Sequence, residues 1–129
     1  MSKKKIFWII AAILNLLTAF VHTIGGQLNL VNPLLKSDLT EQAKTEWLGA
    51  WHMITIFLFA TTYYLLKCAF LKNQNTNTGV IKAIGIIYLL ISIPFIISSI
   101  IMQHFAPQWT ILLPIGIMTL IGLKKEAKI

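Results

Sequence analysis

Four long apolar runs constrain the fold of this chain more than any other feature of its sequence. They cover residues 6–24, 47–71, 80–103 and 107–123. A helix needs about 20 apolar residues to cross the ~30 Å hydrocarbon core of a bilayer, and the first three runs have this length. Isolated strands would leave their backbone groups unpaired in lipid, so each run predicts a membrane-spanning helix. The fourth run is the shortest and contains Pro114.

The composition agrees with a membrane protein. Of the 129 residues, 57% are hydrophobic and only 12% are charged, and the mean hydropathy is +0.76. Soluble domains are roughly half apolar and about a quarter charged, so this chain has too few polar side chains to cover a globule in water. A chain of this length forms one domain. We therefore expect a single all-α domain over residues 1–129, an integral membrane antiparallel four-helix bundle.

Lysines flank the apolar runs unevenly. Two of them, Lys36 and Lys44, lie between the first and second runs, and nine lie at the opposite ends of the runs. The nine are Lys3, Lys4, Lys5, Lys67, Lys72, Lys82, Lys124, Lys125 and Lys128. Short loops rich in lysine face the cytoplasm. This bias predicts a multi-pass protein of the cell (inner) membrane with both termini in the cytoplasm (N-in/C-in).

The segment 25–46 is expected to be an outer loop that holds short helices. Gly25-Gly26 is typical of a helix stop. Asn32-Pro33 indicates a cap followed by a first-turn proline, and segment 37–41 indicates a second helix start. We expect the second of these helices to continue directly into the second span.

The other two connections are short. Residues 72–79 are polar, without apolar anchors, and predict a turn between the second and third spans. Residues 103–107 predict a tight turn between the third and fourth spans.

A histidine cluster near the outer boundary of the membrane is the feature most suggestive of chemistry. Measured along each helix from its cytoplasmic lysines at 1.5 Å per residue, His22, His52 and His104 lie ~25, ~23 and ~33 Å from that end. His22 and His52 belong to stripes of small and polar residues, which in membrane helices usually turn inward. His104 lies one position off the corresponding stripe, so it reaches the others only if its helix end bends.

Three interpretations of these histidines remain open. Neutral imidazoles bind zinc, copper and iron, so His22, His52 and His104 are candidate ligands of a transition metal or of a haem iron. Structural hydrogen bonding is the favoured alternative, because no carboxylate lies within a span to orient an imidazole, as usually happens in metal sites. A protonatable or substrate-contacting role is the third, since ionisable residues inside membranes are commonly functional.

Asn15 lies in the middle of the first span. An unpaired amide is costly in hydrocarbon, so we expect Asn15 to form hydrogen bonds to a neighbouring helix. Thr62, Tyr63 and Ser92 are the expected partners, and the expected role is structural.

Several function classes lack support. The sequence contains no arginine, the residue best suited to bidentate phosphate and base contacts, so we expect no nucleic-acid partner. It contains no catalytic triad, phosphate-binding loop or HExxH motif, so we expect no enzyme. The expected partners are the lipid bilayer and either further copies of this chain or a larger membrane complex.

The first half of the chain resembles an uncharacterised family of small four-helix bacterial inner-membrane proteins. The residues that carry the resemblance are His22-Thr-Ile-Gly25-Gly26, Asn32-Pro33-Leu-Leu, Trp47 and Trp51-His52-Met-Ile-Thr. No activity follows from it, but it implies that the His-Gly-Gly and Trp-His positions form one site. Two functions therefore compete: a protein with an outer-leaflet histidine site for a metal, haem or small ligand, and a non-catalytic accessory subunit of a membrane complex.

Overall fold

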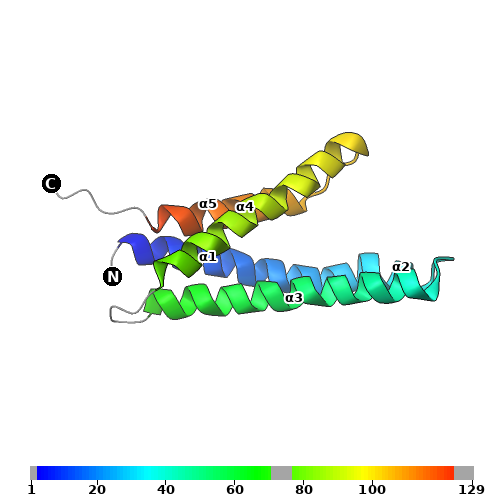
Figure 1. Cartoon of the computed structure of the whole chain (residues 1–129), viewed down its shortest axis with the longest axis horizontal. Helices are drawn as coiled ribbons and strands as arrows, with labels where there is room; N and C mark the ends of the chain where they lie inside the picture. The colour runs from blue at the N-terminus through cyan, green and yellow to red at the C-terminus, as the bar shows by residue number, and fades with distance from the viewer. Residues whose placement is uncertain (1–2, 71–76, 124–129) are drawn as a thin grey trace.

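The computed structural model describes residues 3–70 and 77–123, and within these ranges all regular structure is helical (Figure 1). Helix α1 (Lys3–Phe20) continues into two π-helical stretches, η1 (Val21–Gly25) and η2 (Gln27–Val31), and into the short α2 (Asn32–Leu35). The remaining helices are α3 (Glu41–Phe70), α4 (Thr78–Ile101) and α5 (Gln108–Ile121).

Three helical segments are long and apolar enough to cross a membrane: Lys5–Leu35, Glu41–Phe70 and Thr78–Ile101. This confirms the prediction for the first three apolar runs. Helix α5 is apolar but has only 14 residues, so it is ~21 Å long and shorter than the ~30 Å hydrocarbon core. Large apolar side chains such as Leu17 and Ile56 are 57% and 69% exposed, as expected of surfaces that face lipid.

The structure differs from the prediction of a loop over 25–46. The first helix passes through Gly25-Gly26 and ends at Leu35, so the prediction of a helix stop at the glycines was wrong. Gly26 has right-handed helical angles (φ −69°, ψ −36°). Its lack of a side chain serves packing, because a Cβ there would lie 2.2 Å from the Trp51 ring.

The two π-helical stretches contain hydrogen bonds that span five residues. The N–H of Gly26 donates to Val21 O, and the N–H of Asn32 donates to Gln27 O. Pro33 follows the second bond, and because proline has no N–H it could not continue an α-helical ladder at this point. Asn32 does not cap a helix as predicted; its Oδ1 accepts from Gln27 Nε2 at 3.0 Å.

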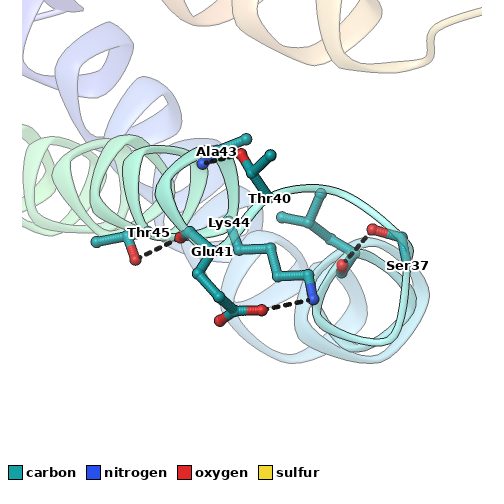
Figure 2. A network of polar contacts seen from close by, with 7 residues as sticks. Ser37, Thr40, Glu41, Ala43, Lys44 and Thr45 are labelled. Carbon is teal, nitrogen blue, oxygen red and sulfur yellow. Dashed lines mark hydrogen bonds and ion pairs between the residues drawn. The ribbon is translucent and has the colours of Figure 1, made fainter.

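The chain reverses direction between Leu35 and Glu41, where α3 begins (Figure 1). Thr40 caps the new helix, since its Oγ1 accepts from the N–H of Ala43 at 3.2 Å (Figure 2). Glu41 and Lys44 form an ion pair of 3.0 Å one turn further along. The helix start predicted in segment 37–41 is therefore confirmed, as is its direct continuation into the second span.

The tight turn after α4 has the geometry of a Schellman motif. Gln103 adopts a positive φ of 49°, its N–H donates to Ile100 O at 3.4 Å, and the N–H of His104 donates to Ser99 O at 3.2 Å. At the other end of α4, Asn77 Oδ1 accepts from the N–H of Gly79. The predicted turn over 72–79 otherwise lies outside the described residues.

Helix α1 packs against α3 and α5, and α4 packs against α5. The α1–α3 pair and the α4–α5 pair lie close together at the end where α1 begins, and they diverge toward the other end (Figure 1). Glycine sets the distance between α4 and α5, because a Cβ on Gly116 would lie 2.9 Å from Gly85 O. Trp8 Nε1 donates to Thr119 O at 3.2 Å and links α1 to α5.

Candidate functional site

A polar cluster joins α1, α3 and α4 in the middle of the fold. Asn15 Nδ2 donates to Leu58 O and to Thr61 Oγ1, both at 2.9 Å. Tyr88 Oη donates to Asn15 Oδ1 at 2.7 Å and also lies 2.7 Å from Thr61 Oγ1. Asn15 and Tyr88 are both 0% exposed. The three side chains form a ring of contacts in which every donor has an acceptor, since Thr61 Oγ1 can donate to Tyr88 Oη or to Phe57 O at 2.8 Å. This arrangement favours a structural role.

The prediction that Asn15 bonds to a neighbouring helix is confirmed, but the predicted partners were wrong. Thr61 and Tyr88 take the places expected for Thr62, Tyr63 and Ser92. Thr62 Oγ1 is buried and has no hydrogen-bond partner among the described residues. On α3, Thr62 and Tyr63 lie one and two positions beyond Thr61, which is a rotation of about 100–200°. On α4, Ser92 lies about one turn beyond Tyr88, on the same face of the helix.

His22 lies in η1 and is held by Trp51 of α3. The two rings stack with centroids 3.8 Å apart and an interplanar angle of 13°. His22 Nε2 lies 3.3 Å from Trp51 O. A carbonyl oxygen only accepts hydrogen bonds, so Nε2 carries the proton and, in the neutral ring, Nδ1 keeps its lone pair.

Gly26 makes this arrangement possible. A Cβ at Gly26 would lie 2.2 and 2.4 Å from two carbon atoms of the Trp51 ring, so any larger residue would displace the indole. Trp51 is only 9% exposed. The residues of the His-Gly-Gly and Trp-His segments therefore lie against one another, although the sequence did not reveal that Trp51 and Gly26 are the residues in contact.

His52 does not lie where the sequence predicted, whereas the exposure of His104 agrees with its predicted position off the inward stripe. His52 is exposed, and the inward position on α3 belongs to Trp51; the prediction that His52 faces the interior was wrong. His104 is exposed in the turn after α4, and Figure 1 shows that turn well separated from the α1–α3 pair.

Glu46 and Asn29 lie in segment 25–46 and form hydrogen bonds to partners other than the histidines. Glu46 Oε1 accepts from Gln42 Nε2 at 3.0 Å, and Asn29 Nδ2 donates to Gly25 O at 2.9 Å. Within residues 3–70 and 77–123, no three His, Cys, Asp or Glu side chains gather closely enough to hold a metal ion. The described contacts fix one imidazole, that of His22, and the assignment of His22, His52 and His104 as metal ligands stays a prediction.

A shallow apolar hollow of about 400 Å³ lies beside the turn between α2 and α3. Leu30, Val31, Leu34, Leu39 and Trp47 provide most of its lining. No titratable or nucleophilic side chain contributes to it apart from the hydroxyl of Ser37, so it offers apolar contact and little chemistry.

No protein-family model, curated protein or solved structure matches this chain.

Proposed function

We propose that this chain is a four-span membrane protein that binds a transition-metal ion at its outer end, with His22 Nδ1 and the imidazole of His52 as ligands. Water or a bound small ligand would fill the remaining coordination positions. In this proposal the helices form an antiparallel bundle, the nine-lysine end faces the cytoplasm, and the histidines lie near the outer surface.

One observation carries the proposal: the His22 ring is already fixed in the manner of a metal ligand. Histidines that bind metals almost always donate their other N–H to a carboxylate, a backbone carbonyl or water, which sets the tautomer and the ring orientation. His22 Nε2 is placed to donate to Trp51 O, and the indole fixes the plane of the ring. The lone pair on Nδ1 is then available, and the ring is only partly buried.

The local backbone supports the same assignment. His22 lies in η1, and π-helical turns inside helices frequently coincide with functional sites. The π-helical turns also carry Gly26 to the point where it admits the Trp51 ring. Backbone geometry, stacking and hydrogen bonding therefore all act on one imidazole.

Metal titration of the detergent-purified protein tests this function. Cu²⁺ should quench tryptophan fluorescence, because a metal on His22 lies next to the Trp51 indole, and its electron paramagnetic resonance spectrum should show imidazole nitrogen. His22→Ala should weaken binding more than about tenfold, which is the scale of losing a principal ligand or its support. His52→Ala should also weaken it, and His104→Ala is the matched control that should not.

Equal losses in His22→Ala and His104→Ala would show only surface histidine binding and would contradict the site. The absorption spectrum of the protein as purified addresses the haem alternative, since a bound haem would give a Soret band that His22→Ala removes.

The orientation has its own test. In a Cys68→Ala background, an impermeant thiol reagent applied from outside should label a cysteine at Thr40 and not one at Asn75, which lies outside the described residues. The reverse pattern would overturn the N-in/C-in arrangement.

An accessory role in a larger membrane complex is the second candidate. The segment Lys5–Leu35 has 31 residues, so it is ~46 Å long and exceeds the hydrocarbon core by about half. Near the far end of this segment, Leu28 is 62% exposed. At the same end of the molecule, Trp47 at the start of α3 is 54% exposed. Co-purification of a stoichiometric partner that Trp47→Ala releases would favour this role.

A further inference from the structure

We infer that Thr55 is a positioning residue for His22: its hydroxyl shares the carbonyl oxygen of Trp51 with the imidazole and so limits how firmly the imidazole is held. The inference rests on the proposed function where it treats His22 as a metal ligand. The shared contact itself requires no metal.

Trp51 O is the acceptor that the two side chains share. His22 Nε2 of the first helix lies 3.3 Å from it, and Thr55 Oγ1, one turn further along α3, donates to it at 3.1 Å. Trp51 lies inside α3, so its carbonyl also accepts the helical N–H four residues later. A carbonyl oxygen has two lone pairs. Three donors therefore compete for two positions, and the imidazole has the longer of the two side-chain distances.

A second contact of the same kind lies two turns away along both helices. His22 is seven residues after Asn15 on the first helix, and Trp51 is seven residues before Leu58 on α3. Asn15 Nδ2 donates to Leu58 O at 2.9 Å. Because seven residues are close to two helical turns, Asn15 and His22 leave the same face of the first helix. The two contacts are therefore comparable, and they differ in length.

The threonine four residues after each carbonyl accounts for the difference. After Leu58 this residue is Thr62, which is 4% exposed and whose hydroxyl has no hydrogen-bond partner among the described residues. After Trp51 it is Thr55, whose hydroxyl keeps its local bond. The donor from the first helix lies at 2.9 Å where the threonine does not bond to the carbonyl, and at 3.3 Å where it does.

Thr61 does not weaken this comparison. Its Oγ1 lies 3.1 Å from Leu58 O, but it lies closer to two other acceptors, Phe57 O at 2.8 Å and Tyr88 Oη at 2.7 Å. Either of these can take the proton of Thr61. Leu58 O therefore remains open to Asn15, whereas the hydroxyl of Thr55 is bonded to Trp51 O alone.

The shared carbonyl has a consequence for metal binding. A cation on His22 Nδ1 makes the N–H at Nε2 a stronger donor, and hydrogen bonds from charged donors are shorter and stronger than neutral ones. A firmer bond from this second nitrogen in turn makes the imidazole a better ligand. The hydroxyl of Thr55 opposes that change as long as it occupies the same carbonyl. Thr55 thus sets the affinity of His22 for a metal without touching the metal.

Nuclear magnetic resonance of the metal-free, full-length protein in detergent tests the positioning. Thr55→Val keeps the shape of the side chain and removes the competing donor, so the Nε2–H proton of His22 should shift downfield as its hydrogen bond shortens. Thr55→Ser keeps the hydroxyl and should leave the proton at its wild-type position. The loss of the signal in His22→Ala assigns it.

Thr18→Val is the matched control. Thr18 lies one turn before His22 on the first helix, is partly buried like Thr55, and donates to Leu14 O, a carbonyl to which no other side chain among the described residues donates. This variant should leave the His22 proton unchanged. An unmoved proton in Thr55→Val, or a shift of equal size in Thr18→Val or Thr55→Ser, would overturn the inference.

The Cu²⁺ fluorescence titration tests the consequence for metal binding. Thr55→Val should raise the Cu²⁺ affinity about twofold to tenfold, the range that one neutral hydrogen bond covers, and Thr55→Ser and Thr18→Val should not change it. Unchanged affinity in Thr55→Val would overturn the role of Thr55 in metal binding. If His22→Ala keeps full Cu²⁺ binding, the proposed metal site fails, whereas an unmoved His22 proton in Thr55→Val removes only the role of Thr55.

Discussion

The α1–α3 pair and the α4–α5 pair solve the same packing problem in different ways. Between α1 and α3, polar side chains cross the interface at Asn15 and at the His22–Trp51 stack. Between α4 and α5, the contact is close approach of backbone at Gly85 and Gly116. Lipid does not drive helices together as water does, so small residues and interhelical hydrogen bonds are the available means. Each pair uses mainly one of them.

Most hydroxyl groups behave alike in the two pairs. In α4 and α5, Ser92, Ser99 and Thr119 donate to carbonyl oxygens four residues earlier in their own helices. These hydroxyls donate their hydrogen bonds within their own helices, so they donate none to a neighbouring helix. In α1 and α3, Thr18 and Thr55 form the same local bonds. Thr61 also lies 2.8 Å from Phe57 O, four residues earlier, and in addition accepts a hydrogen bond from Asn15 Nδ2 of α1. A hydroxyl with a local bond can therefore still accept from a neighbouring helix.

The largest effect on the free energy of unfolding is expected where the backbones of α4 and α5 are in contact. Gly116→Ala places a Cβ 2.9 Å from Gly85 O, and since backbone cannot move aside easily, the free energy of unfolding should fall by about 1–3 kcal/mol. Unfolding by denaturing detergent measures this change. Gly49→Ala is the control, because a Cβ there meets nothing within 4 Å; it should stabilise α3 by about 0.5–1 kcal/mol. Equal behaviour of both variants would remove the special role of glycine between α4 and α5.

Breaking the ring of hydrogen bonds should have the next largest effect. Asn15→Leu and Tyr88→Phe each remove a bond between helices and should destabilise the fold by about 1–2 kcal/mol, the range for such bonds in membranes. Ser92→Ala is the control, because Ser92 bonds only to Tyr88 O in its own helix, and its effect should be near zero. Asn15→Leu should also leave metal binding intact. Loss of binding with an intact fold would instead make Asn15 part of the site.

Gly26→Ala should weaken metal binding at the histidine site and leave the fold intact. The added methyl displaces the Trp51 ring, so His22 loses the stacked indole that fixes the plane of its ring. Metal affinity should fall by about tenfold or more, as when the support of a ligand is removed, while the helices remain. The Cu²⁺ fluorescence titration gives the affinity and circular dichroism gives the helix content. Retained affinity would mean that Trp51 does not orient His22.

The smallest effect is expected at the turn of the α4–α5 pair. Gln103 adopts a φ of 49°, which glycine tolerates better than residues with a side chain. Gln103→Gly should therefore raise the free energy of unfolding by about 0.5–1 kcal/mol. Its neighbour Met102 has right-handed angles, so Met102→Gly should lower it by up to about 1 kcal/mol. A decrease in both variants would contradict the Schellman geometry.

Sequence reasoning predicted what depends on average polarity and missed what depends on the rotation of one helix against another. The apolar runs predicted the helices, because burial in lipid requires long apolar segments. His52 and Trp51 are adjacent, and which of them turns inward depends on about 100° of rotation. The stripe of small residues favoured His52, whereas the large indole fills the interface. Asn15 was assigned the right role, and its partner on α3 was missed for the same reason.

Gly25-Gly26 shows a second limit. Locally, a glycine pair is a stop signal, because glycine costs a helix about 1 kcal/mol relative to alanine. The Trp51 ring, 25 residues further along the chain, fills the space above Gly26 and gives that position a reason invisible to local propensity. Tertiary contact outweighed propensity there.

The π-helical stretches have a consequence for how this protein can change its length during evolution. In an α-helix, inserting one residue rotates everything beyond it by about 100° and destroys every existing contact with the neighbouring helix. The bonds Val21–Gly26 and Gln27–Asn32 each span five residues, so each loop of backbone holds one residue more than an α-helical bond would. An extra residue can be accommodated in such a turn while the residues on either side keep their register. Residues 21–32 are therefore the part of the first helix where single insertions and deletions should survive, and residues 6–20 the part where they should not.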